Sequence, residues 1–323
     1  MTFRHFATLL CVLAAPLFGV VAPLRAETPL AAVPVPDVEA VTAAHAEFWR
    51  AYEKRDLWRV SLVWDTADDT ISAAFPASST ISVSWSNIQE SFRRSFSHNR
   101  DIKIDVRTLR TNREGDVAWV LSAVRFEAIQ TQTGQFVLLD RMLTTEIYRL
   151  KDSAWRLVHY HGHYPGFRPQ AEDPATMVAA PTRPAPTDSP AWQAHERFVA
   201  AFSAKDLGAM FGLLSSEKDG SAMQPMSPIP FLGPENVVAS WKKTFADVEA
   251  LTIEPLKVVV SESGSVAWIT EHSQYHIAFK AQPDLVQHFH NVLTTYLLRK
   301  EAGQWQIVHY HAHLGFAFED HEH

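Results

Sequence analysis

The sequence predicts an α+β fold arranged as two tandem domains, and three observations lead to this prediction. The second half of the chain repeats the first, since "AHAEFWRAYEKRDL" at Ala44 returns as "AHERFVAAFSAKDL" at Ala194. A segment rich in proline and alanine separates the two copies. Each copy begins with helical patterns and ends with strand patterns, an order typical of helices packed on one face of an antiparallel sheet.

The repeat extends along the whole domain. "DVAWV" at Asp116 returns as "SVAWI" at Ser265, and "LTTEIYRLKDSAWRLVHYH" at Leu143 returns as "LTTYLLRKEAGQWQIVHYH" at Leu293. Matching residues are 149 or 150 positions apart, and the segments keep their order. One whole domain has therefore been duplicated, which excludes a solenoid of short repeats.

The repeat and the composition set the domain boundaries. We place the first domain at residues 37–167 and the second at residues 189–317, with a semi-extended linker over residues 168–188. The chain has 323 residues, of which 46% are hydrophobic, as is usual for globular proteins. Its net charge of −7 argues against a nucleic-acid partner, which would require a basic face.

Residues 1–26 have the pattern of a secretory signal peptide. Arg4 supplies a positive start, an apolar stretch follows, and "PLRA" fits a cleavage site after Ala26. Pro16 interrupts the apolar run, which is shorter than the ~20 residues of a spanning helix, so we expect no stable membrane span after signal removal. An uncleaved anchor is the alternative. The only cysteine, Cys11, lies in the signal, so an exported, periplasmic or secreted chain would carry no disulfide or thiolate ligand.

Two helices are predicted at the start of each domain. In the first copy His45, Phe48 and Tyr52 share one helical face, spaced i, i+3 and i+7. A short second helix follows in each copy, with Asp56 or Asp206 as its N-cap. The residues equivalent to the first stripe in the second copy are His195, Phe198 and Phe202.

A third helix completes the helical part of each domain. Ser86 and Gln89 form a capping-box pattern at its start in the first copy. In the second copy Pro234 fits the first helical turn. The apolar stripes that follow are Ile88, Phe92 and Phe96 in one copy and Val237, Trp241 and Phe245 in the other.

Three or four strands fill the rest of each domain and end in "WRLVHYHGHYPGF" or "WQIVHYHAHLGF". Alternate residues of a strand share a face, so His159, His161 and His163 lie together. We expect this face to line a cavity and the opposite face, with Val158 and Tyr160, to pack sheet on sheet. The equivalent histidines of the second copy are His309, His311 and His313.

This order of helices and strands, with a terminal "W-x-hydrophobic-V-H-x-H", resembles the nuclear transport factor 2-like superfamily, above all its SnoaL-like branch. The resemblance covers nearly all of the chain beyond the signal. It implies two cone-shaped domains, each a strongly curved antiparallel sheet wrapped around three helices and enclosing a cavity. Members use that cavity for isomerisation, dehydration, cyclisation, epoxide hydrolysis or simple binding. Many dimerise through the sheet, so a tandem copy would supply an intramolecular domain pairing that mimics a dimer.

The resemblance fails at one position. The terminal strand of SnoaL-like relatives often has the pattern His-x-His-x-Ser, whereas this chain has a third histidine in place of the serine. That histidine is His163 in the first copy and His313 in the second. The departure leaves three hypotheses open for the histidines.

The first hypothesis is an exported protein that binds a small apolar or aromatic molecule in histidine-lined cavities. The ligand-binding residues would then be His45, His163, His195, His313 and Tyr148. Buried imidazoles need hydrogen-bond partners, and Tyr148, Thr144 and Thr294 on the neighbouring strand of each copy are candidates.

The second hypothesis is a cofactor-independent lyase or isomerase. A histidine with an ordinary pKa near 6.5 moves protons at neutral pH, and Asp140 or Glu146 would be its carboxylate partner. The catalytic residues would be His159, His161, His309, His311 and Asp140.

The third hypothesis is a divalent transition metal, because two histidines at i and i+2 on a strand can reach one ion. If Leu298 pairs with Trp305, His290 falls opposite His313, and Asp140 falls opposite His163. The ligands would come from His195, His290, His309, His311 and His313. No cofactor is certain from the sequence.

Overall fold

The first copy folds as three helices and a six-stranded sheet in the computed structural model, which describes residues 38–165 and 188–315 except 77 and 226. The predicted signal peptide and all but the last residue of the predicted linker lie outside these residues. The helices are α1 (Val38–Glu53), α2 (Leu57–Val63) and α3 (Trp85–His98). The strands are β1 (Ser72–Ala74), β2 (Ser82–Val83), β3 (Asn99–Glu114), β4 (Val117–Gln130), β5 (Phe136–Lys151) and β6 (Ala154–His163).

The second copy repeats this plan, and the described residues of both copies belong to one compact unit. Its helices are α4 (Pro190–Ser203), α5 (Leu207–Leu213) and α6 (Pro234–Ala246). Its strands are β7 (Ser221–Met223), β8 (Phe231–Leu232), β9 (Val248–Ser263), β10 (Val266–Phe279), β11 (Gln282–Glu301) and β12 (Gln304–Leu314).

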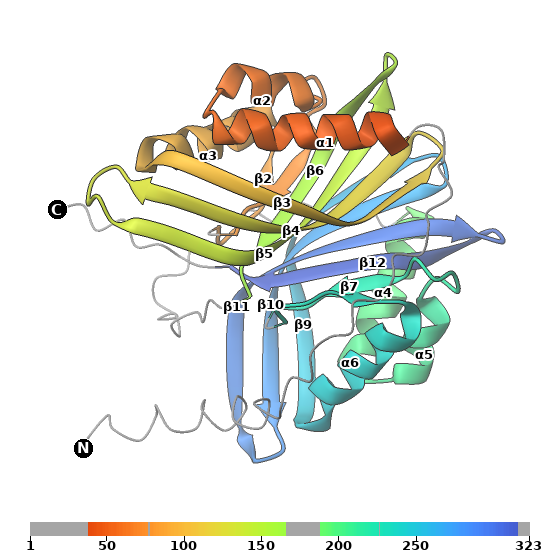
Figure 1. Cartoon of the computed structure of the whole chain (residues 1–323). Helices are drawn as coiled ribbons and strands as arrows, with labels where there is room; N and C mark the ends of the chain where they lie inside the picture. The colour runs from red at the N-terminus through yellow and green to blue at the C-terminus, as the bar shows by residue number, and fades with distance from the viewer. Residues whose placement is uncertain (1–37, 77, 166–187, 226, 316–323) are drawn as a thin grey trace, which may run out of the picture. The chain divides into compact units, whose positions relative to one another are not determined.

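The two sheets have the same topology. The strand order is β2-β1-β6-β5-β4-β3 in one copy and β8-β7-β12-β11-β10-β9 in the other. The four long strands of each sheet are antiparallel, and the short β1 and β7 lie parallel to β6 and β12. In each copy the three helices cover one face of the curved sheet (Figure 1). The predicted α+β fold with two tandem domains is confirmed.

Local sequence determines where the short second helices begin. The side chain of Asp56 accepts a hydrogen bond from the backbone N–H of Arg59 at 3.0 Å, and Asp206 does the same for Ala209 at 3.0 Å. Each carboxylate thus satisfies one of the backbone donors that a helix start leaves unpaired. The two predicted N-caps are confirmed.

The third helix begins differently from the prediction. α3 starts at Trp85 with Ser84 as N-cap and no side-chain capping bond, so the predicted capping box of Ser86 and Gln89 is wrong. The chain passes directly from β2 into the helix, which leaves Ser86 inside the first turn. Ser84 takes φ +72°, where its second-copy equivalent is Gly233 with φ +89°. Glycine adopts this backbone conformation without steric cost and serine does not.

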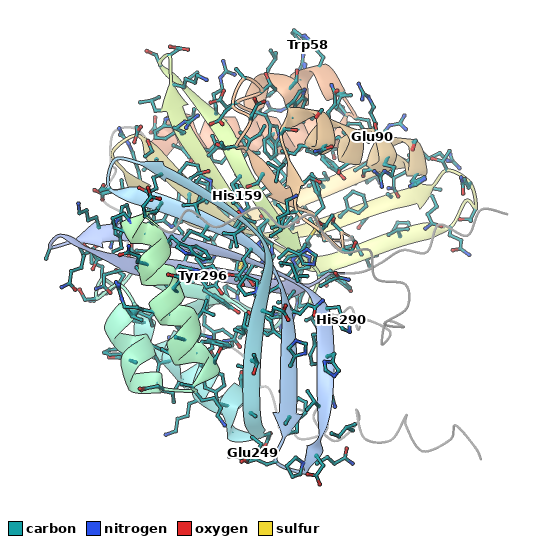
Figure 2. The ribbon with its side chains drawn as sticks, turned by 180° about the vertical axis from the view of Figure 1, so that it is seen from behind. Trp58, Glu90, His159, Glu249, His290 and Tyr296 are labelled. Atoms are coloured by element: carbon teal, nitrogen blue, oxygen red, sulfur yellow. The ribbon has the colours of Figure 1, made fainter. Side chains whose placement is uncertain are left out.

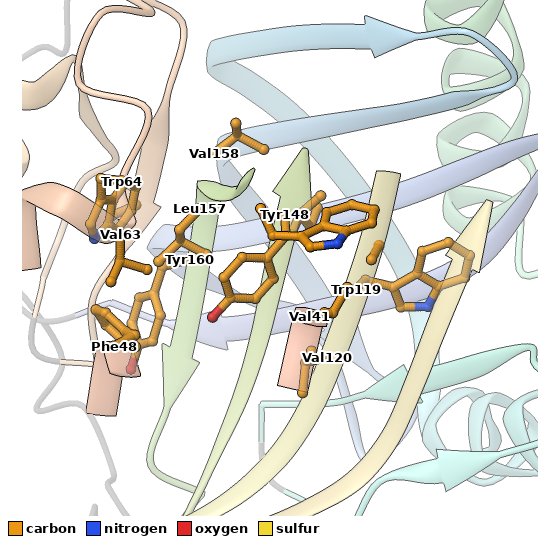
Figure 3. Close-up of a cluster of buried hydrophobic side chains, with 14 of the residues drawn as sticks. Val41, Phe48, Val63, Trp64, Trp119, Val120, Tyr148, Leu157, Val158 and Tyr160 are labelled. Carbon is orange, nitrogen blue, oxygen red and sulfur yellow. The ribbon is translucent and has the colours of Figure 1, made fainter. Parts of the chain in front are cut away.

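A cluster of aromatic side chains fills the space between the helices and the sheet in each copy. Phe48 on α1 packs against Tyr160 on β6 (Figure 3). Their ring centroids are 5.9 Å apart. In the second copy Phe198 packs against Tyr310 at 6.3 Å and Trp241 at 5.5 Å. These contacts confirm that the predicted helical stripes face the sheet.

The face of the terminal strand that the histidines occupy is opposite to the predicted one. Ile147 pairs with His159, but the next residue of β5 pairs with Leu157, so Val158 is an extra residue in β6. One extra residue reverses the alternation of side chains. Tyr160 therefore faces the helices and the histidines face away from them. The expectation of a histidine-lined cavity under the helices is wrong for these residues.

The second copy contains the same irregularity. Leu297 pairs with His309 and Leu298 with Ile307, which leaves Val308 as the extra residue of β12. Tyr310 consequently faces the helices of its own copy. The two β-bulges belong to the repeated plan, because they occur at equivalent positions of the duplicated domain.

The predicted hairpin register is also wrong. A two-residue turn at Ala302 and Gly303, both with positive φ, pairs Lys300 with Trp305. His313 then lies opposite Leu293 and not opposite His290. In the first copy the equivalent pairing places His163 opposite Leu143, so Asp140 is not its partner.

Candidate functional site

A buried carboxylate occupies the interior of the first copy. Glu146 on β5 is fully buried and receives hydrogen bonds from side chains of both α1 and β5. His45 Nδ1 lies 2.7 Å from its Oε2, and Trp49 Nε1 donates to its Oε1 at 2.9 Å. The hydroxyl of Tyr148 donates to Oε2 at 2.5 Å. Thr144 Oγ1 is a fourth donor, 3.5 Å from Oε1, and these four hydrogen bonds offset the cost of burying the carboxylate.

The same carboxylate controls the protonation of His45. Burial alone would lower the pKa of His45, but the charge of Glu146 and its hydrogen bond outweigh burial, so the pKa is raised above 6.5. The other ring nitrogen, Nε2, lies 3.3 Å from the hydroxyl of Ser122. Burial and the neighbouring Glu146 also hold the pKa of Tyr148 well above its ordinary value of 10, so the phenol remains a donor.

His45 also lines a pocket between α1 and β3. The pocket has a volume of about 360 Å³. Ile104, Val106 and the indole of Trp49 supply apolar wall, while Arg50 and Glu53 contribute charged groups. Its complete lining is Thr42, His45, Ala46, Trp49, Arg50, Glu53, Ile104, Val106 and Thr108. The pocket therefore combines an apolar wall with an imidazole that is bonded to a buried carboxylate.

The second copy keeps a histidine–carboxylate pair but builds it from another strand. His195 Nε2 lies 2.9 Å from Glu271 Oε2, without the alignment of a hydrogen bond. Glu271 on β10 stands at the position of Ser122, whereas the position of Glu146 is occupied by Tyr296. Tyr296 packs edge-on against the His195 ring at 4.4 Å and lies beside α4 (Figure 2). The two interiors have thus diverged in chemistry.

The six histidines of the terminal strands, here called the histidine ladder, lie against residues of the other copy. One hydrogen-bonded series runs from Ser72 to His159, Thr295, His161 and finally His313. Its successive distances are 2.8, 2.8, 2.8 and 2.7 Å. Each threonine hydroxyl in such a series can donate to one imidazole and accept from the other.

A second series repeats the first with the copies exchanged. It runs from Ser221 to His309, Thr145, His311 and finally His163. Its successive distances are also 2.8, 2.8, 2.8 and 2.7 Å. The rings of His161 and His311 stack at 3.7 Å where the two series meet.

The ladder is neutral at physiological pH. Burial lowers the pKa of His159, His309 and His313 to about 3 and that of His163 to about 4. For His309 the positive charge of Arg110 adds to the effect of burial. The two central rings, His161 and His311, have a pKa well below 6.5 because of burial and their imidazole neighbours. In His159, His161, His309 and His311 both ring nitrogens are engaged, so an added proton would turn an accepting nitrogen toward another donor.

The predicted ligand-binding residues fall into two groups. His45, Tyr148 and His195 lie in the cone interiors, beside Glu146 or Glu271. His163 and His313 lie in the ladder with the predicted catalytic histidines 159, 161, 309 and 311. Asp140, the predicted catalytic carboxylate, is an exposed residue of β5.

The predicted metal ligands do not converge on one point. His195 lies in the cone interior, and His309, His311 and His313 are engaged in the ladder. His290 lies elsewhere on β11 (Figure 2), with its ring 5.9 Å from that of His288. Within residues 38–165 and 188–315, no group of three or more His, Cys, Asp or Glu side chains is arranged to hold a metal ion.

Three residues of the interiors had no place among the predicted site residues. Glu271 is the carboxylate of the second pair, Trp49 donates to the carboxylate of the first, and Trp192 stacks on His195 with ring centroids 4.6 Å apart. The sequence could have pointed to Glu271, because the first copy has serine at the equivalent position and the two copies therefore differ there in charge. The sequence could have pointed to Trp192 in the same way, because its counterpart in the first copy is the much smaller Thr42.

Several solved structures are similar to part of the chain. The chain is similar to a putative dehydratase of the NTF2-like family from Streptomyces avermitilis, with 20% identity and a TM-score of 0.37, over 41% of this chain and 98% of that one. It is also similar to a ketosteroid isomerase-like protein from Erwinia carotovora atroseptica, with 23% identity and a TM-score of 0.33, over 38% of this chain and 91% of that one. A third similar structure is an NTF2-like superfamily protein from Salmonella enterica, with 16% identity and a TM-score of 0.37, over 42% of this chain and 95% of that one. No curated protein matches the chain.

The family model described as the SnoaL-like domain matches the chain twice, over residues 41–165 and again over residues 192–315. These two matches together span most of the 323 residues and coincide with the two folded copies. The chain therefore belongs to the SnoaL-like family and contains two consecutive copies of its domain.

Proposed function

We propose that the first copy binds a small molecule that has an apolar or aromatic body and one polar head. The pocket between α1 and β3 would hold the body against Ile104 and Val106, with the head at His45. One observation carries this proposal. His45 lines the pocket and is at the same time bonded, at 2.7 Å, to the fully buried carboxylate of Glu146.

The energetic cost of burying Glu146 supports a functional role for the pair that it forms with His45. Taking a carboxylate out of water is expensive, and an apolar side chain of similar size would fill the same space without that cost. Ionisable pairs with a shifted pKa that border a pocket are common at binding and catalytic sites. The raised pKa of His45 and its position at the pocket wall fit this description.

A second candidate is proton transfer at the same place. A histidine whose pKa lies above 6.5 can act as an acid near neutral pH, and Glu146 would stabilise the imidazolium. A reaction of this kind moves a proton next to a carbonyl group, as in an isomerase or lyase, without a cofactor. The acid–base role that the sequence suggested for the ladder histidines would then belong to His45.

The two copies are also proposed to pair within one chain as two subunits pair in a dimer. The equal hydrogen-bonded series of the ladder support this pairing. A protease site placed in the linker, residues 168–188, would test it. The cut halves should elute together from a sizing column near neutral pH, and separate elution would contradict the pairing.

Export through residues 1–26 remains a proposal from the sequence. N-terminal sequencing of the protein from the native host should begin at Glu27, and a retained Met1 would contradict cleavage. Within the residues described, no helix is long and apolar enough to cross a membrane.

The binding proposal is tested with 2-naphthol, an aromatic phenol whose hydroxyl resembles that of an enol. We expect the wild-type chain to bind it in calorimetric titration at neutral pH. His45→Gln should weaken binding at least tenfold, because one charge-assisted hydrogen bond stabilises by about 1.5–3 kcal/mol. His98→Gln, an exposed histidine on α3, is the matched control and should bind as the wild type does. Equal affinity of His45→Gln and wild type, with both folded by circular dichroism, would contradict the proposal.

A further inference from the structure

We infer that Trp192 closes the interior of the second copy, so that each chain has one open site and one closed site. This inference rests on the proposed function of the first copy. It concerns which of the two histidine–carboxylate pairs a small molecule can reach, and it identifies the side chain that makes the difference.

Trp192 and Thr42 are equivalent residues of the duplicated domain. Both stand three positions before the interior histidine, since Thr42 precedes His45 and Trp192 precedes His195 by one helical turn. In the first copy the small Thr42 is exposed and lines the pocket. In the second copy the indole of Trp192 is only 4% exposed. A large apolar group thus occupies the side of the histidine that borders the pocket in the first copy.

The contact between Trp192 and His195 is direct. Their ring centroids are 4.6 Å apart with an angle of 29° between the planes, so the indole covers one face of the imidazole. Tyr296 covers another side of the ring edge-on at 4.4 Å. His195 is 1% exposed and His45 is 4% exposed, so the two sites differ in the indole that covers the ring of His195 and not in the exposure of the imidazoles. A ligand head can reach the pair with Glu271 only if the indole moves.

Other substitutions around the second site agree with closure. Trp49, whose indole contacts the carboxylate in the first copy, corresponds to Val199 in the second. The tryptophan of the second copy, Trp192, stands about two helical turns earlier. The charged pocket residues Arg50 and Glu53 are replaced by Ala200 and Ser203. These two charged side chains of the pocket therefore have no charged counterpart in the second copy.

The exchange of residues between the copies tests this inference, with 2-naphthol as the probe. Calorimetry of the wild-type chain should give one equivalent bound. Trp192→Thr should give two, and Thr42→Trp should give none. The double variant should again bind one equivalent, with binding now sensitive to His195→Gln and insensitive to His45→Gln. Trp192→Phe keeps an aromatic ring in place and should bind one equivalent.

Two results would overturn the inference. One is a folded Trp192→Thr variant that still binds a single equivalent, and the other is a wild-type chain that binds two. If Trp192→Thr does not fold, the Thr42→Trp variant tests the inference instead. A Thr42→Trp variant that binds 2-naphthol as well as the wild type does would show that an indole at this position does not close the pocket. A wild-type chain that binds nothing refutes the proposed function instead, so the two failures are distinguishable.

Discussion

The histidine ladder should make the stability of the protein strongly dependent on pH. The pKa of His159, His309 and His313 is about 3 in the folded chain and that of His163 about 4, mainly because of burial. In the unfolded chain a histidine has a pKa of about 6.5. Between these values the unfolded chain binds protons that the folded chain does not. The contribution of the ladder is therefore complete above pH 6.5 and is lost as the pH falls toward 4.

The size of the effect follows from these shifts. At about pH 5.5 each of the four histidines whose pKa is about 3 or 4 favours unfolding by about 1 kcal/mol. His161 and His311 act in the same direction, so the ladder as a whole removes several kcal/mol. A typical domain has a total stability of only about 5–15 kcal/mol. His45 has the opposite sign, because its raised pKa favours the folded state increasingly as the pH falls, and it offsets part of the loss. Carboxylates contribute little, since their ordinary pKa values lie near 4, below this range.

Urea unfolding at pH 7.5 and pH 5.5, followed by tryptophan fluorescence, measures the difference. The double variant His159→Gln/His309→Gln should lose about a third of the pH dependence, because two of the six ladder histidines with a lowered pKa are gone. His98→Gln, exposed on α3, should retain all of it. A wild-type free energy of unfolding that changes by less than about 1 kcal/mol between the two pH values would refute the reasoning.

Two further predictions concern single positions. Glu146→Gln should lower the pKa of His45 below 6.5 in an NMR titration, since burial would then act without the opposing charge, whereas Glu271→Gln should leave that pKa unchanged. An unaltered pKa of His45 in Glu146→Gln would show that the pair is not coupled. Ser84→Gly should stabilise the protein by about 1 kcal/mol in urea unfolding, because it relieves a φ of +72°, and the reciprocal Gly233→Ser should destabilise it by a similar amount. Equal stability of Ser84→Gly and wild type would exclude strain at this turn.

The sequence predicted those parts of the fold that depend on local pattern. Repeated segments revealed the duplication, and the i, i+3, i+7 stripes identified which helical faces pack on the sheet. The N-caps Asp56 and Asp206 were predicted correctly because a cap needs only a carboxylate and the next helical turn.

The errors arose where pairing between strands decides the outcome. The extra residues Val158 and Val308 reverse the face of the sheet on which the histidines that follow them lie. No residue within those strands predicts a bulge. The histidines were rightly expected to share a face, but that face meets the other copy. The register was misjudged because a two-residue turn moved the partner of Trp305 from Leu298 to Lys300.

The candidate site could be found only in part from the sequence. His45, His195 and Tyr148 were identified from the helical stripe and the strand pattern. Their partners come from distant strands, and the carboxylate changes strand between the copies, from Glu146 on β5 to Glu271 on β10. Only the three-dimensional structure brings such residues together.

The central claim is that the pocket beside His45 and Glu146 binds the polar head of a small molecule. The most direct measurement is an NMR titration of the histidine ring signals with 2-naphthol, with the His45 signal assigned from His45→Gln. The signal of His45 should shift and saturate at one equivalent, while those of the buried ladder histidines remain in place. If the His45 signal does not move, or if the ladder signals move instead, the proposed site is wrong.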